Sequence, residues 1–219
     1  RAGSKTSATT AASSSSTCFS LESVLAFNPD FVYLDVTMHG HLTKNLRSLG
    51  ITVFETNITS INDMFSEIQE LSTILGISQK GEELISVIKE SFPQQIHQAG
   101  EVQKPKVYWE IWNDPYMSIG NTSFINDIIL QAGGENIFSD VKASYPIVSE
   151  ESIIARNPQL ILLPSDSPET LESLSQRTNW KSIDAIQNKH VVKIDGDLIS
   201  RPGPRIGEAI RSVQEALQK

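Results

Sequence analysis

One stretch of the chain occurs twice, and this repeat constrains the fold more than any other feature. Residues 20–34 read SLESVLAFNPDFVYL, and residues 149–163 read SEESIIARNPQLILL. Aligned without a gap, the copies share the pattern S-x-E-S-x-x-A-x-N-P-x-x-x-x-L, and most other pairs are apolar in both. A gapless match of this length predicts an internally repeated architecture.

Each copy predicts one helix followed by one strand. Ser20 and Ser149 are suited to cap the helix, because a serine oxygen accepts a hydrogen bond from a first-turn amide. Glu22 and Glu151 then place a carboxylate at the positive end of the helix dipole. The Asn-Pro pair is expected to end each helix, because proline disfavours helical geometry in the residue before it.

The apolar runs at 31–34 and 160–163 are typical of strands that are buried on both faces of a parallel sheet. Two such units predict two similar α/β lobes. Apolar spacing and Gly or Pro signals predict further helices at 42–49, 61–75, 79–99, 123–132, 168–176 and 204–217, strands at 51–54, 107–112 and 191–194, and loops at 137–146 and 195–203.

These elements suggest a domain division. We expect the Ser/Thr/Ala-rich tract to be flexible, because it has too few apolar residues to form a core. The predicted segments are the tract at 1–17, an N-terminal lobe at 18–78, a linking helix at 79–104 and a C-terminal lobe at 105–219.

Composition excludes several classes of protein. A net charge of −8 argues against a nucleic-acid-binding protein, which needs a basic surface. No apolar run approaches the roughly 20 residues of a membrane span. Cys18 is the only cysteine, so an internal disulfide and a multi-cysteine metal site are excluded. The chain begins at Arg1 without an apolar signal segment, so we expect a processed chain or a fragment and no lipid anchor at Cys18.

Three ordered segments resemble the cobalamin, haem and ferric-siderophore family of substrate-binding proteins for ABC importers. They are WEIWNDPYMSIGNTSFINDIILQAGGENIF, of which the first part is most similar to the cobalamin-binding branch, then YPIVSEESIIARNPQLILL and DGDLISRPGPRIGEAI. The resemblance covers residue 19 to the C-terminus. It implies two α/β lobes joined by one long helix, with the ligand in the cleft between them. Family members usually have strands and a helix before the first repeat, so the first lobe is expected to be truncated.

The resemblance assigns the two repeated glutamates to permease docking. In the family, one glutamate at this place on each lobe contacts arginines of the membrane permease, which implies this role for Glu22 and Glu151. The alternative is that both carboxylates only complement their helix dipoles.

Ligand contacts are expected mainly in the second lobe. Tyr116 and Tyr145 match positions where the family places aromatic rings against a flat macrocycle, and Trp112 and Met117 are neighbours that add apolar surface. The alternative for these aromatic residues is a place in the core, which we expect for Trp109 because it alternates along a strand.

Polar contacts are expected from the loop before the last helix, which reaches the ligand in the family. Asp197 is suited to accept hydrogen bonds from ligand amides, and Arg201 to bind a carboxylate. The alternative is an internal Asp–Arg pair. In the first lobe, Asp35 follows a strand end, where open α/β sheets bind ligands. His39 and His41 lack a further ligand at metal-binding spacing, so no metal site is expected.

The sequence therefore predicts a binding protein and not an enzyme, because no phosphate loop, G-x-S-x-G or H-E-x-x-H motif is present. We expect an extracytoplasmic, cell-envelope-associated monomer without a cofactor, which delivers a cobalamin-like corrinoid to an ABC permease. The alternatives are a haem or ferric-siderophore binding protein, and an interaction or sensor domain that has kept the fold and lost the ligand.

Overall fold

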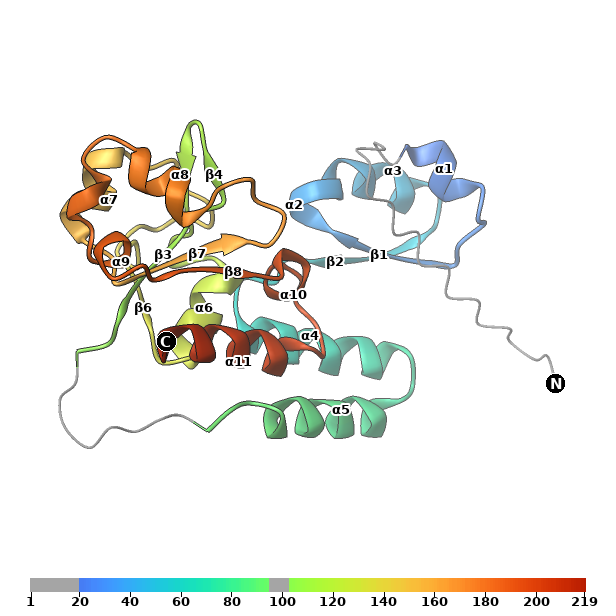
Figure 1. The fold of residues 1–219 in the computed structure, drawn as a ribbon. Coiled ribbons are helices and arrows are strands. Elements are labelled where there is room, and N and C mark those ends of the chain that lie inside the picture. Colours follow the sequence, from blue (N-terminus) through green and yellow to red (C-terminus); the bar gives the residue numbers. More distant parts are fainter. Residues whose placement is uncertain (1–19, 95–102) are drawn as a thin grey trace. The chain divides into compact units, whose positions relative to one another are not determined.

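The computed structural model describes residues 20–94 and 103–219, and the chain divides into two compact units, Arg1–Asn57 and Ile58–Lys219 (Figure 1). The predictions for the tract at 1–17, for Cys18 and for residues 95–102 of the linking helix lie outside the described residues.

The first unit is a short α/β unit. Strands β1 and β2 pair in parallel, with Phe31 opposite Thr52. Its small core contains Leu34, Leu42 and Leu46. Within β1 only Leu34 is buried, so the prediction of a strand buried on both faces is wrong for the first copy of the repeat. The elements are α1 (Leu21–Leu25), β1 (Phe31–Asp35), α2 (Val36–His39), the 3-10 helix η1 (Gly40–Leu42), α3 (Thr43–Ser48) and β2 (Thr52–Thr56).

The second unit is built on a four-stranded parallel sheet of order β6-β3-β7-β8, and β4 and β5 form a separate hairpin. Its strands are β3 (Lys106–Trp109), β4 (Trp112–Asn113), β5 (Tyr116–Met117), β6 (Glu135–Asn136), β7 (Leu160–Pro164) and β8 (Val191–Ile194). Its helices are α4 (Ile61–Ile74), α5 (Ser78–Glu90), α6 (Phe124–Gln131), α7 (Glu150–Arg156), α8 (Leu171–Gln176), the 3-10 helix η2 (Trp180–Ser182), α9 (Asp184–Gln187), α10 (Gly196–Ser200) and α11 (Ile206–Leu217).

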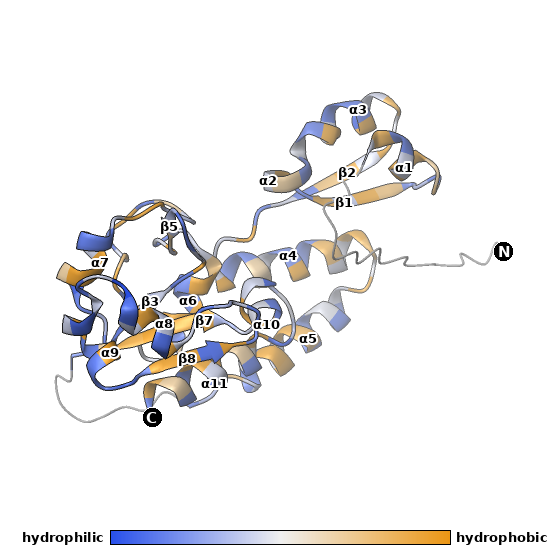
Figure 2. Ribbon diagram, turned by 45° about the horizontal axis from the view of Figure 1, so that its top comes forward, coloured by the Kyte–Doolittle hydropathy of each residue, from blue (hydrophilic) through white to orange (hydrophobic). Residues whose placement is uncertain are grey.

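Side-chain alternation along β7 divides the core of this unit into two layers. Leu160 and Leu162 pack with the α6 and α11 side, whereas Ile161 and Leu163 pack with the α7, α8 and α9 side. All four residues are fully buried. The prediction of a strand buried on both faces is therefore confirmed for the second copy, and Figure 2 shows β7 as a hydrophobic strand.

Helices α4 and α5 belong to the second unit, whereas the predicted N-terminal lobe extends to residue 78. Ile61, Met64 and Ile88 from these helices join the core beneath the sheet. Helix α5 ends at Glu90, before Pro93, so the predicted helix at 79–99 is too long. Its C-terminal end approaches α11 at Gly207, where a Cβ atom would lie 2.1 Å from the Ser91 hydroxyl oxygen.

The two copies of the repeat have the same local geometry. In each, the predicted serine cap accepts from the amide of the serine three residues on, at 3.2 Å. The hydroxyl of that second serine donates back to the carbonyl of the cap at 2.7 Å. Asn28 and Asn157 have φ angles of 47° and 48°, so a left-handed asparagine lies between each helix and Pro29 or Pro158.

Two further segments differ from the prediction. The segment after β3 turns into the β4–β5 hairpin instead of continuing as one strand to residue 112. The predicted loop at 195–203 contains helix α10, because the Asp195 carboxylate accepts from the amides of Asp197 and Leu198 and so caps a helical turn. Within the described ranges, no helix has the length and apolar character needed to cross a membrane.

Candidate functional site

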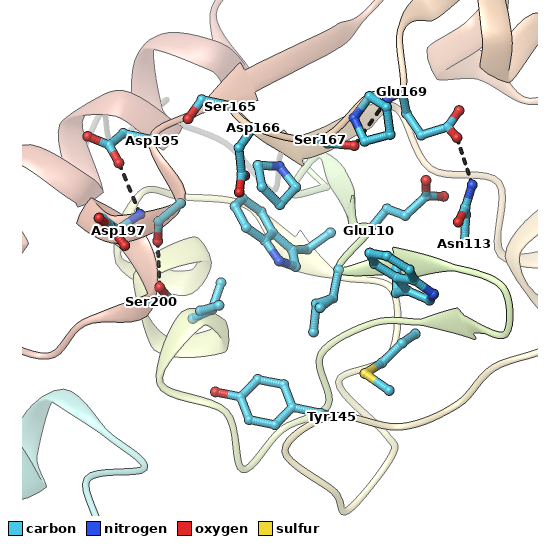
Figure 3. Close-up of a pocket in the computed structure, with 18 residues that line it drawn as sticks. Glu110, Asn113, Tyr145, Ser165, Asp166, Ser167, Glu169, Asp195, Asp197 and Ser200 are labelled. Atoms are coloured by element: carbon cyan, nitrogen blue, oxygen red, sulfur yellow. Dashed lines mark hydrogen bonds between the residues drawn. The ribbon is translucent and has the colours of Figure 1, made fainter. Parts of the chain in front are cut away.

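A pocket of about 910 Å³ lies in the second unit (Figure 3). Three segments at the carboxyl ends of parallel strands surround it: the residues after β3, the β7–α8 loop and the β8–α10 turn. This is the edge at which open α/β sheets generally bind ligands. The lining residues are Trp109, Glu110, Ile111, Trp112, Asn113, Met117, Ile125, Tyr145, Pro164, Ser165, Asp166, Ser167, Pro168, Glu169, Asp195, Gly196, Asp197 and Ser200.

Four of the predicted ligand-contacting residues line this pocket: Trp112, Met117, Tyr145 and Asp197. The Trp112 and Tyr145 side chains are 59% and 54% exposed, so they offer aromatic surface that the protein's own core does not cover. Trp109 is 2% exposed and belongs to the core, as predicted, and its side also forms part of the pocket wall.

The loop that carries Tyr145 is held against the segment after β5. The Gly120 amide donates to the Ser144 carbonyl at 3.2 Å, and the Ser118 amide donates to the Pro146 carbonyl at 3.1 Å. A Cβ atom at Gly120 would lie 2.2 Å from the Ala143 carbonyl oxygen, so this close approach requires glycine. Tyr145 is thus presented by a loop whose two flanks are fixed.

Three predicted residues lie elsewhere. Tyr116 is on the other face of the hairpin from Met117, since successive side chains of a strand point to opposite faces, and it packs 5.9 Å from Trp180. Arg201 forms a 3.0 Å ion pair with Asp197, which is the internal pair that we considered as an alternative. Asp35 is in the first unit and caps α2 by accepting from the amides of Thr37 and Met38.

The polar part of the pocket lining is acidic. Five carboxylates line it, and neither lysine nor arginine is among the described lining residues. Figure 3 shows Asp195 and Asp197 on one side and Glu169 on the opposite side. Asp166 is exposed and takes part in no ion pair among the described residues. Glu110, Glu169 and Asp197 are paired with arginines. Asp166 and Asp195 are therefore the lining carboxylates that favour neutral hydrogen-bond donors and cations over anions.

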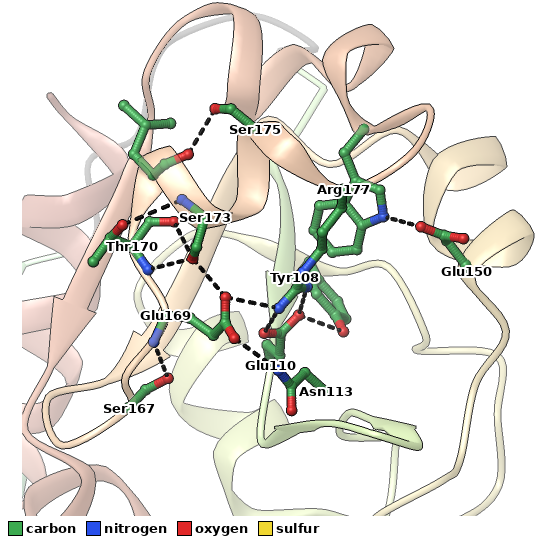
Figure 4. Close-up of polar contacts among 12 residues, drawn as sticks. Tyr108, Glu110, Asn113, Glu150, Ser167, Glu169, Thr170, Ser173, Ser175 and Arg177 are labelled. Atoms are coloured by element: carbon green, nitrogen blue, oxygen red, sulfur yellow. Dashed lines mark hydrogen bonds and ion pairs between the residues drawn. The ribbon is translucent and has the colours of Figure 1, made fainter.

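A largely buried ionic cluster, of which Glu110 and Glu169 also line the pocket, was not predicted (Figure 4). Arg177 donates to both carboxylate oxygens of Glu110, at 2.6 and 2.8 Å. It also forms a 3.1 Å ion pair with Glu169. Its guanidinium lies 4.5 Å from the Trp180 ring and 5.3 Å from the Tyr116 ring. We call these five residues the Arg177 cluster.

Burial and the charged partners together set the pKa values in and beside the Arg177 cluster. Burial disfavours the Arg177 cation, but the hydrogen bonds and charge of Glu110, aided by Glu169, outweigh this effect and raise the pKa of Arg177. Burial raises the pKa of Tyr116 and, well above its ordinary value, that of Tyr108, which donates to Glu110 at 3.4 Å. Arg177 is therefore a permanent cation and both tyrosines stay neutral at physiological pH.

The two repeated glutamates are exposed and lie in the first turns of α1 and α7. A backbone hydrogen bond, with a further contribution from Ser20, lowers the pKa of Glu22. Neighbouring Glu150 has a different environment, because it accepts from the Trp180 indole at 2.7 Å. His39 and His41 have ring centroids 6.5 Å apart, and no group of three or more metal-ligating side chains is present in the described part of the chain.

The family model for periplasmic binding proteins matches residues 6–198. The chain belongs to the periplasmic binding protein family. This is a family of extracytoplasmic solute-binding proteins and not an enzyme family. The resemblance to the substrate-binding proteins of ABC importers is therefore confirmed.

Proteins and solved structures of this family are similar to the chain over most of its length. A vitamin B12-binding protein of Vibrio parahaemolyticus is 26% identical over 199 residues, which are 89% of this chain and 70% of that protein. A possible iron-binding (periplasmic solute-binding) protein of Staphylococcus epidermidis superposes with a TM-score of 0.79 at 25% identity, over 91% of this chain and 80% of that one. The periplasmic vitamin B12 binding protein BtuF of Vibrio cholerae has a TM-score of 0.67 at 19% identity, over 90% and 77% of the two chains, and shows the shared fold.

Proposed function

We propose that this protein is the substrate-binding protein of an ABC importer and that it captures a cobalamin-like corrinoid for delivery to a membrane permease. The relatives named vitamin B12-binding proteins support this assignment, and an ABC transporter substrate-binding lipoprotein of Bacillus subtilis, 24% identical, supports the transport class. The protein acts as a monomer at the cell envelope and needs no cofactor of its own.

The pocket lining is the observation that carries the choice of ligand. It combines apolar surface from Trp112, Met117 and Tyr145 with carboxylates such as Asp197 and Asp166. A corrin ring offers a broad apolar face, and its peripheral amides donate N–H groups that carboxylates accept. Haem offers two carboxylates instead, and these would face the like charges of Asp166 and Asp195, while Arg201 is engaged by Asp197. At a separation of about 4 Å in water, each such pair costs about 1 kcal/mol.

A titration of the purified chain with cyanocobalamin, cobinamide, haemin and a ferric hydroxamate tests this proposal. Visible absorbance and calorimetry should give saturable one-to-one binding of the corrinoids. Trp112→Ala should weaken this binding about tenfold or more, because the lost aromatic contact is worth about 1.5–3 kcal/mol. Val87→Ala is the matched control, since Val87 is also exposed but lies on α5 and not in the pocket lining.

The other outcomes of this titration are informative. A preference for haemin or for the hydroxamate would keep the transport class and overturn the corrinoid assignment. Binding of none of the four compounds would favour the ligand-free interaction domain that shares this fold.

Glu22 and Glu151 dock the protein on the permease in this proposal. Their equivalent caps give each carboxylate the same place in its own helix, which suits recognition by the equivalent subunits of a two-fold permease. The double variant Glu22→Lys/Glu151→Lys should bind the corrinoid normally and lose permease binding in proteoliposomes. Glu172→Lys, which reverses an exposed first-turn charge of α8, is the control. Permease binding that survives the double reversal unchanged would refute the docking role.

A further inference from the structure

The β4–β5 hairpin has two chemically different faces. Its register pairs Trp112 with Met117 and Asn113 with Tyr116. Cross-strand partners share a face, so Trp112 and Met117 point together toward the pocket that both line. Of the other pair, Tyr116 belongs to the Arg177 cluster, and Asn113, which also lies at the edge of the pocket lining, donates its amide to Glu169 of that cluster.

Glu169 joins this second face to the buried charge. One of its carboxylate oxygens accepts from the Asn113 side-chain amide at 2.7 Å. The other accepts from the Ser173 hydroxyl at 2.6 Å and lies 3.1 Å from an Arg177 nitrogen. The Glu169 side chain is 16% exposed and that of Arg177 is 12% exposed. One oxygen of the Glu169 carboxylate thus bonds to helix α8, and the other bonds to the β4–β5 hairpin (Figure 4).

Strand β4 needs such an anchor. Strand β5 is already held by the bridge between Met117 and Ile147 and by the Val148 amide, which donates to the Tyr116 carbonyl at 2.9 Å. Strand β4 has two residues, and a two-residue pairing alone is at best marginally stable in water. Trp112 itself makes a local bond, from its indole to the Asp114 carbonyl at 2.9 Å, which fixes the ring only relative to the hairpin. The position of the ring in the pocket therefore depends on what holds the hairpin to the rest of the unit.

We infer that Glu169 is a positioning residue for ligand binding: through Asn113 it fixes the β4–β5 hairpin to Arg177 and so sets where Trp112 stands in the pocket. The ligand part of this inference rests on the proposed function, whereas the position of Trp112 can be measured without any ligand. Pre-organising a contact surface increases affinity because less motion is lost on binding.

Exchanging donor and acceptor across the bond tests the inference. Asn113→Asp places a carboxylate against the Glu169 carboxylate and should release the hairpin. The double variant Asn113→Asp/Glu169→Gln restores a hydrogen bond in the opposite direction, and Arg177 keeps its two bonds to Glu110. Glu172→Gln removes the same charge from the exposed side of α8 and is the control.

Acrylamide quenching of tryptophan emission in the ligand-free chain is the first readout. The chain has three tryptophans, and because Trp109 and Trp180 are buried, quenching reports on Trp112. The second readout is corrinoid affinity. Asn113→Asp should raise the quenching constant about twofold and weaken binding about tenfold, the size expected for a lost bond to a charged group. The double variant should return the quenching constant to its wild-type value and the affinity to within about twofold of the wild type, and Glu172→Gln should change neither.

Wild-type quenching in Asn113→Asp, or a double variant no better than the single one, would overturn the inference. Circular dichroism checks that each variant is folded, and Asn113→Ala, at an exposed position, replaces the aspartate variant if that one is not. If the wild-type chain binds no corrinoid, the proposed function fails, and the quenching comparison alone decides the role of Glu169.

Discussion

Replacing Arg177 by methionine is expected to destabilise the second unit by about 4 kcal/mol. Breaking a buried ion pair by removing one partner costs about 3–5 kcal/mol, because the remaining charge is left unpaired. Glu110 fits that case, since its side chain is 3% exposed and it accepts two hydrogen bonds from Arg177. Methionine keeps apolar contact with Trp180, so the lost cation over that ring adds about 1 kcal/mol at most.

Urea denaturation followed by tryptophan emission measures this loss. A domain is stable by about 5–15 kcal/mol in total, so a change of this size shifts the midpoint clearly. The double variant Glu110→Gln/Arg177→Met should recover about 1–2 kcal/mol, because a buried amide costs less than an unpaired buried charge.

Arg201→Met is the matched control. Arg201 also pairs with a carboxylate, that of Asp197, but the two side chains are 70% and 68% exposed, so its loss should cost less than about 1 kcal/mol. Equal stability of Arg177→Met and Arg201→Met would show that burial does not set the cost of breaking the pair. If adding Glu110→Gln to Arg177→Met lowered stability further, the unpaired Glu110 charge would not be the cause of the loss.

Two further predictions concern helix packing and pH. Gly207→Ala should destabilise the chain by about 1–3 kcal/mol in the same assay, because its Cβ would collide with Ser91, whereas Gly203→Ala, with its nearest atom 4.0 Å away, should cost far less. Asp63 accepts from the Thr59 hydroxyl at 2.8 Å; partial burial alone would raise its pKa, but its hydrogen bonds lower the pKa below 3.8. Asp63→Ala should therefore be less stable at pH 7 by about 1 kcal/mol, and this difference should shrink as the pH of thermal melts falls below about 4.

Features that depend on neighbouring residues could be predicted from the sequence. Ser20 and Ser149 cap their helices as predicted, and Gly76 follows the end of α4 with a φ of 70°. These signals are local, because the donor and acceptor lie within one turn. The Asn-Pro signal gave the right end for α7, whose C-cap is the left-handed Asn157, whereas α1 already ends at Leu25, with Ala26 as its C-cap, ahead of Asn28.

The candidate site could be predicted only in part. Trp112 and Met117 share a face because of the hairpin register, and the turn between them could have signalled this, since residues paired across a two-residue turn lie side by side. Tyr116, one position away, takes the opposite face for the same reason. The pair of Arg177 and Glu110 has no such signal, because 67 residues separate its members and only the completed sheet brings them together.

The unequal burial of the two repeats has a consequence for hydrogen exchange. Helix α7 contributes the fully buried Ile153, whereas α1 has no buried residue. Strand β7 is covered on both faces, and β1 contributes only Leu34 to a core of three buried side chains. Local opening requires the loss of few apolar contacts where the core is small. The amides of β1 should therefore exchange with solvent long before those of β7, so that one sequence pattern yields a fast-exchanging and a slow-exchanging copy within one chain.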